Sequence, residues 1–148
     1  MTEYPIRLFA DAAAVRRVGT GLLDRTLPRA EWTHEAHLAA CLWLVVERPD
    51  IDLPRELPGI IRAYNVSVGG VNDATQGYHE TLTQLYIRGV RAFACAHPDG
   101  DLAARVNALL ISPLGARDWP LRFYSRERLF SAQARLGWAE PDLAPIGS

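Results

Sequence analysis

Apolar residues recur every three to four positions along most of the chain, which is the spacing of α-helices that bury one face. This spacing predicts helices over residues 11–26, 33–47, 53–68, 78–96, 101–110 and 125–136. Four of these segments begin at a residue that favours the N-cap position, namely Asp11, Thr33, Asp101 and Ser125. No segment alternates apolar and polar residues between hairpin turns, so we expect no β-strands.

The segment 33–47 is apolar on every side in its middle, as expected for a helix at the centre of a bundle. Its apolar run, residues 38–46, is much shorter than the roughly 20 residues needed to cross a bilayer. Pro58 is expected either in the first turn of the helix over 53–68 or at a break in that helix. Three glycines among small polar residues predict an irregular loop at 69–77, which could form the wall or lid of a site.

These elements predict an all-α fold, a single-domain bundle of five to seven helices over residues 1–148. From Trp138 onward, two prolines predict an extended C-terminal tail. A chain of 148 residues falls within the usual size of one domain. At about this length a chain buries enough surface to form a core without disulfides or structural metals.

Composition narrows the classes of partner. The chain carries 16 basic and 17 acidic residues, a net charge of −1, and so lacks the basic surplus of proteins that bind nucleic acids or anionic membranes. All 16 basic residues are arginine, which excludes lysine Schiff bases and the lysine of a phosphate-binding loop. With only Cys41 and Cys95 and no apolar leader at the N-terminus, we expect a cytoplasmic protein with reduced thiols.

Three of the four histidines lie at two predicted helix starts. His34 and His37 are three residues apart in the first turn of the helix over 33–47, so both rings share one face. His79 lies in the first turn of the helix over 78–96. Where a bundle brings these helix starts together, three imidazoles converge and leave a fourth position open, as in a catalytic divalent metal site. Histidine ligands suit Zn, Fe, Ni or Cu without distinguishing among them.

Residues near the histidines complete this hypothesis. Glu35 and Glu80 are candidates for a general base, although Glu35 is offset by about 100° from its neighbour around the helix and is expected to point elsewhere. Cys41 lies two turns deeper and is expected to fill the core. Polar or amphipathic residues that could line a small-molecule pocket are Trp32, Tyr64, Asn65, Tyr78 and Arg126.

Ordinary structural roles also account for these residues. Paired histidines at a helix start can bond backbone carbonyls and water, and glutamates are favoured in a first turn. Three functions therefore stay open. The first is a metal-dependent enzyme or metal-binding protein that acts on a small polar molecule. The second is a metal-free helical module that binds a small molecule, and the third is a helical protein-interaction domain that could form a homodimer.

Short motifs also suggest a relationship. They are Trp-Thr-His-Glu-Ala-His-Leu at 32–38, Tyr-Asn at 64–65 before the glycine-rich loop, Gly-Tyr-His-Glu-Thr at 77–81 and Tyr-Ser-Arg-Glu at 124–127. Together they resemble an uncharacterised family of small bacterial helical proteins, from about residue 27 to the C-terminus. The resemblance implies that His34, His37 and His79 belong to one group, and it implies no particular activity.

Overall fold

A computed structural model describes residues 6–146. Within this range the fold has no β-strand, and the predicted all-α bundle is confirmed. The α-helices are α1 (Ala12–Asp24), α2 (His34–Glu47), α3 (Leu53–Ser67), α4 (Glu80–Ala96), α5 (Leu102–Ile111), α6 (Arg126–Leu129) and α7 (Ala132–Leu136). Short 3₁₀-helices are η1 (Arg29–Glu31), η2 (Pro113–Gly115) and η3 (Trp119–Arg122). No helix in the described range is both long enough and apolar enough to span a membrane.

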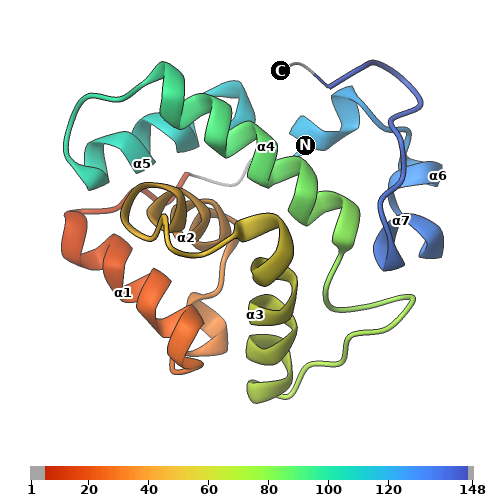
Figure 1. The fold of residues 1–148 in the computed structure, drawn as a ribbon, viewed down its shortest axis with the longest axis horizontal. Helices are drawn as coiled ribbons and strands as arrows, with labels where there is room; N and C mark the ends of the chain where they lie inside the picture. The colour runs from red at the N-terminus through yellow and green to blue at the C-terminus, as the bar shows by residue number, and fades with distance from the viewer. Residues whose placement is uncertain (1–5, 147–148) are drawn as a thin grey trace.

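Helix α2 is the centre of the main core and packs against α1, α4 and α5 (Figure 1). Its residues Ala39, Leu42 and Leu44 are completely buried, in agreement with a sequence that is apolar on all sides. The close approach of α1 depends on glycine, because a Cβ at Gly19 would lie 2.2 Å from the ring of Trp43. The predicted central helix is therefore confirmed.

The four predicted N-caps are confirmed, since each side chain accepts a hydrogen bond from the backbone N–H three residues later. Two boundaries differ from prediction. Helix α4 begins at Glu80 and not at residue 78, because His79 is itself the N-cap. The single helix predicted over 125–136 is wrong, because the segment forms α6 and α7, and Ser131 caps the second of them.

Pro58 lies in the second turn of α3, and the helix continues through it. The expectation that Pro58 would lie in the first turn or break the helix is wrong. A proline in this position removes the hydrogen bond to the carbonyl group four residues earlier, here that of Pro54. The side-chain amide of Gln84 donates to this carbonyl at 3.0 Å. The bond replaces the lost one and connects α3 with α4.

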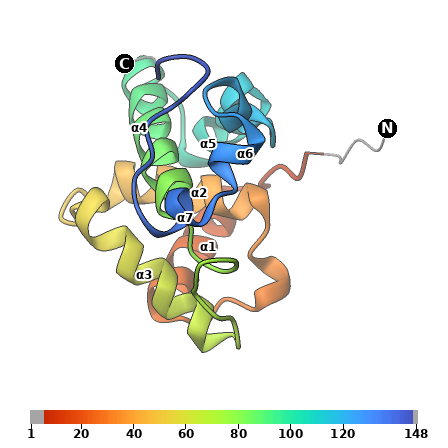
Figure 2. The same cartoon turned by 90° about the vertical axis from the view of Figure 1, so that its right-hand side faces the viewer.

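The C-terminal segment packs against α4 around a second buried cluster. Figure 2 shows α7 beside the N-terminal end of α4. The Thr81 hydroxyl of α4 donates to the carbonyl of Gly137 at 2.9 Å and accepts from the N–H of Ala139 at 3.0 Å. The predicted tail contains no helix from Trp138 to Ile146, and its last two residues lie outside the described range, as do residues 1–5. The segment is thereby held along one side of the bundle.

Candidate functional site

A cavity of about 920 Å³ lies between α2, α3, the first turns of α4 and the segment from η2 to α6. Its volume is within the range of small-molecule pockets. The loop after α3 forms part of the wall through residues 68–71 and 76–77. The three histidines of the sequence hypothesis, His34, His37 and His79, all line this cavity.

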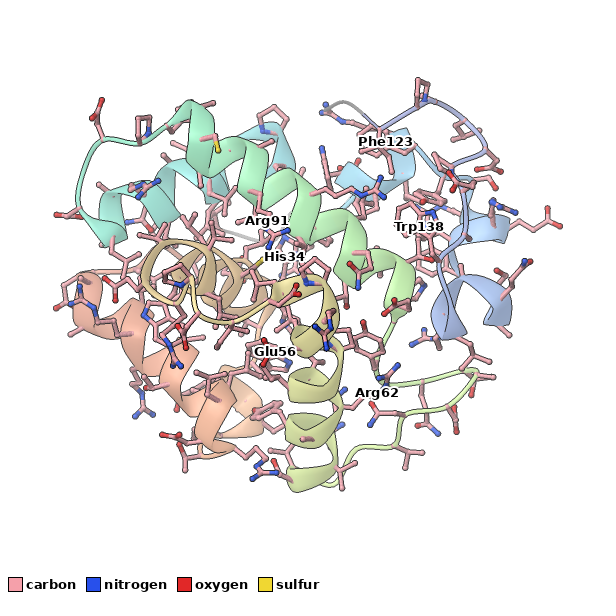
Figure 3. The ribbon with its side chains drawn as sticks, in the orientation of Figure 1. His34, Glu56, Arg62, Arg91, Phe123 and Trp138 are labelled. Atoms are coloured by element: carbon pink, nitrogen blue, oxygen red, sulfur yellow. The ribbon has the colours of Figure 1, made fainter. Side chains whose placement is uncertain are left out.

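His34 and His37 come from the first turn of α2, and Figure 3 shows His34 near the middle of the molecule. Nε2 of His34 lies 2.8 Å from the carbonyl oxygen of Gly115, and Nδ1 of His37 lies 2.6 Å from that of Thr33. A carbonyl oxygen only accepts, so in the neutral rings these nitrogens carry the protons. Nδ1 of His34 and Nε2 of His37 therefore hold lone pairs, and neither forms a hydrogen bond with residues 6–146.

The His37 ring stacks on Trp32, with ring centroids 3.8 Å apart. His37 is exposed to the cavity, yet the surrounding side chains displace part of the water around its ring. This desolvation lowers the pKa of His37 to about 4, the carbonyl of Thr33 opposes the shift, and nearby His34 adds to it. His37 is consequently neutral at pH 7 and presents Nε2 as a hydrogen-bond acceptor.

His79 is buried, with 7% of its surface exposed. Its Nδ1 accepts a hydrogen bond from the N–H of Leu82 at 3.1 Å, and its Nε2–H donates to the carbonyl of Leu129 at 2.7 Å. Burial lowers the pKa of His79, and the carbonyl of Leu129 opposes that shift. Both ring nitrogens are in use, so His79 can bind a metal only by giving up one of these bonds.

No group of three or more His, Cys, Asp or Glu side chains in the described range is arranged to hold a metal ion. Cys41 also lines the cavity, where burial raises the pKa of its thiol to about 12. The thiol is therefore protonated at neutral pH and is a poor nucleophile.

The two candidate general bases lie outside the cavity wall. Glu35 is 4% exposed and faces the other side of α2, where it lines a separate hollow of about 400 Å³. Its Oε1 has no hydrogen-bond partner in the described range and lies 3.9 Å from Nη2 of Arg117. Glu80 accepts a hydrogen bond from the hydroxyl of Tyr78 at 2.5 Å and one from Gln84 at 3.4 Å. Neither carboxylate faces the histidine pair across the cavity.

The predicted pocket residues that line the cavity are Trp32, Asn65, Tyr78 and Arg126. Tyr64 does not line it, because the side chain is fully buried and its hydroxyl donates to the carbonyl of Leu27 at 2.9 Å. Asn65 shapes the loop by donating to Oδ1 of Asn72, which also accepts from the backbone N–H of Tyr78. Tyr64 is thus a packing residue that connects α3 to the segment before α2.

Several other polar residues of the wall were not predicted from the sequence, namely Arg29, Thr83, Arg117 and Asp118. Arg29 begins η1, and Arg117 and Asp118 lie between η2 and η3. Such short connections have no apolar period, so nothing in the local pattern indicates which way their side chains point. Arg117 follows η2, whose position depends on its packing against α5.

Comparison with known proteins gave no match: no protein family, no curated protein and no solved structure matches the chain. The resemblance suggested by the motifs around the histidines stays a prediction. The cavity and its side chains are therefore the features that bear on function.

Proposed function

We propose that this chain is a metal-free small-molecule-binding protein and that its ligand occupies the cavity between α2, α3 and α4. The main support is the histidine pair at the cavity wall. Nδ1 of His34 and Nε2 of His37 are lone-pair acceptors whose partner nitrogens are each held by a backbone carbonyl. Because these bonds fix the tautomers, the two acceptors are ready for a ligand before it binds.

The surroundings of the pair fit a ligand with an apolar body and a hydrogen-bond donor. Leu38, Leu57, Ile61 and Leu82 provide apolar wall, and Trp32 provides an aromatic face. A hydroxyl, amine or amide N–H can donate to Nε2 of His37. Binding is favoured over general-base catalysis, because a base whose pKa is about 4 accepts protons poorly at pH 7.

The test is a fragment screen followed by substitution of His37. Small molecules that bind are found from an increase in the melting temperature and from ¹H–¹⁵N chemical-shift changes. His37→Phe preserves the stacked ring and removes Nε2, so it should abolish or sharply weaken binding of donor-bearing fragments.

His97→Phe is the matched control. Nδ1 of His97 also faces the carbonyl four residues earlier, that of Phe93, at 3.1 Å, and its ring also stacks on an aromatic side chain, but the residue lies outside the cavity. Binding should be unchanged in this variant. A screen without hits, or hits equally affected by the two substitutions, would refute the proposal.

A second candidate is a divalent metal site formed by His34 and His37 and completed by water or a bound molecule. It is favoured by the carbonyl bond on the other nitrogen of each ring, an arrangement found in most metal-binding histidines. The measurement is calorimetric titration of the chelator-treated protein with Zn²⁺, Ni²⁺ or Cu²⁺. Binding lost in His37→Phe and kept in His79→Gln supports the pair. Binding lost in both variants supports the three-histidine site, and no binding refutes both.

A further inference from the structure

Positively charged side chains outnumber negatively charged ones on the cavity wall. The charged residues of the wall are Arg29, Arg117, Arg126 and Asp118. Arg117 faces Glu35, whereas neither Arg29 nor Arg126 forms an ion pair with any residue from 6 to 146. Asp118 is the single acidic residue of the wall within that range. The wall therefore carries two arginines that lack an acidic partner, and it carries only one carboxylate.

The nearby acids do not restore the balance. Glu35 is buried behind α2, where it faces Arg117, and Glu80 is occupied by Tyr78 and Gln84. The histidines of the wall add no positive or negative charge when they are neutral. An incoming ligand consequently meets a surplus of positive charge.

Cations outside the wall act in the same direction. Burial raises the pKa of the Cys41 thiol, and the positive charge of Arg91 opposes this shift. Burial lowers the pKa of His79, and Arg135 lowers it further. These arginines contribute a positive potential at Cys41 and His79, whereas the negative charges of Glu80 and Asp118 help raise the pKa values of the wall residues Tyr78 and Tyr86.

The arginines and His37 each require a different chemical group on the ligand. The planar guanidinium of arginine donates paired hydrogen bonds to carboxylate and phosphate groups. The lone pair on Nε2 of His37 repels an anionic oxygen and needs a donor instead. The apolar wall between them suits a hydrocarbon or aromatic body. A ligand that satisfies all three has an acidic group, an apolar body and a separate donor.

We propose that the ligand of this cavity is an organic anion whose carboxylate or phosphate is bound by an arginine of the wall, Arg29 or Arg126, and whose hydroxyl or N–H group donates to His37. The inference rests on the proposed function, because it assigns the chemistry of the molecule that the same cavity binds. Carboxylate and phosphate share the chemistry that arginine recognises, so the experiment must separate them.

The experiment is an NMR titration of the whole chain with matched compounds. They are para-hydroxyphenyl and omega-hydroxyalkyl carboxylates, their phosphonate analogues and their neutral primary amides. The acids should bind about tenfold more tightly than the amides, because a hydrogen bond to a charged group contributes at least that factor. Tighter binding of the carboxylates assigns a carboxylate ligand, and tighter binding of the phosphonates assigns a phosphate ligand.

Substitutions identify the arginines. At least one of Arg29→Gln and Arg126→Gln should weaken binding of the acids by about tenfold and leave binding of the amides unchanged. Arg55→Gln is the control, because Arg55 is exposed on α3 and lies outside the cavity wall. Melting temperatures close to that of the parent protein establish that the variants are folded.

The outcomes separate this inference from the proposed function. Amides that bind as tightly as the acids, or acid binding that is unaffected by both arginine substitutions, overturn the anion and leave the cavity as a binding site. If neutral fragments bind and the acids do not, the anion is likewise overturned and the cavity is still a binding site. No binding by acids, amides or neutral fragments overturns the proposed function itself.

Discussion

Replacing His79 with alanine removes two hydrogen bonds that join separate parts of the fold. One is the bond from the N–H of Leu82 to Nδ1, which caps α4, and the other is the bond from Nε2–H to the carbonyl of Leu129 at the end of α6. Both are made by one buried ring, so a single substitution tests whether His79 has a structural role.

The size of the effect follows from these two contacts. Loss of a side-chain N-cap costs about 1 kcal/mol. A buried carbonyl left without a donor costs about 1–3 kcal/mol more. His79→Ala should therefore lower the free energy of unfolding by about 2–4 kcal/mol. His79→Asn restores a good cap but is too short to reach Leu129, so it should recover about 1 kcal/mol of that loss.

Urea denaturation followed by far-ultraviolet circular dichroism and tryptophan fluorescence measures these differences. The parent protein is also unfolded in the presence of EDTA. If His79 has a structural role, the free energy of unfolding should decrease from the parent to His79→Asn and further to His79→Ala. EDTA should then have no effect on the parent. The reasoning is refuted if alanine and asparagine are equally destabilising, or if EDTA reduces the stability of the parent to that of the alanine variant, which would identify His79 as a metal ligand.

Three more predictions concern the core, the cavity and the thiols. Gly19→Ala should cost about 1–3 kcal/mol of stability in urea denaturation, because its Cβ overlaps a tryptophan ring, whereas Gly59→Ala, which meets open space, should stabilise by about 0.5–1 kcal/mol. Since the pKa of His37 falls from 6.5 in the unfolded chain to about 4, the unfolded chain binds more protons between these values. Stability should therefore decline as the pH falls through this window, and less steeply in His37→Phe. Iodoacetamide followed by mass spectrometry should label exposed Cys95 in the native protein and buried Cys41 only after denaturation.

Local signals in the sequence predicted most of the helices because their caps and apolar faces involve neighbours a few residues apart. The break between α6 and α7 was missed because apolar residues continue at helical spacing across Phe130, which is in fact 56% exposed. The continuous helix through Pro58 was missed for another reason. The donor that replaces the lost bond comes from Gln84, thirty residues beyond the acceptor Pro54, and no local pattern records that contact.

The candidate site shows the same division. The shared face of His34 and His37 follows from their spacing within one helical turn. The position of His79 on the same cavity could be expected only if α2 and α4 pack together, which they do. The hydrogen bond of the His79 ring could not be predicted, because the carbonyl that accepts from Nε2–H belongs to Leu129, fifty residues later.

The attachment of the C-terminal segment also bears on the shape of the cavity. Arg126 and Leu129 contribute to the cavity, and the chain that follows them returns to α4 at Thr81. The Thr81 hydroxyl contacts the segment at Gly137 and Ala139, and Arg135 of the same segment donates to the carbonyl of Gly77. Thr81, which does not line the cavity, thus helps to fix one of its walls from outside.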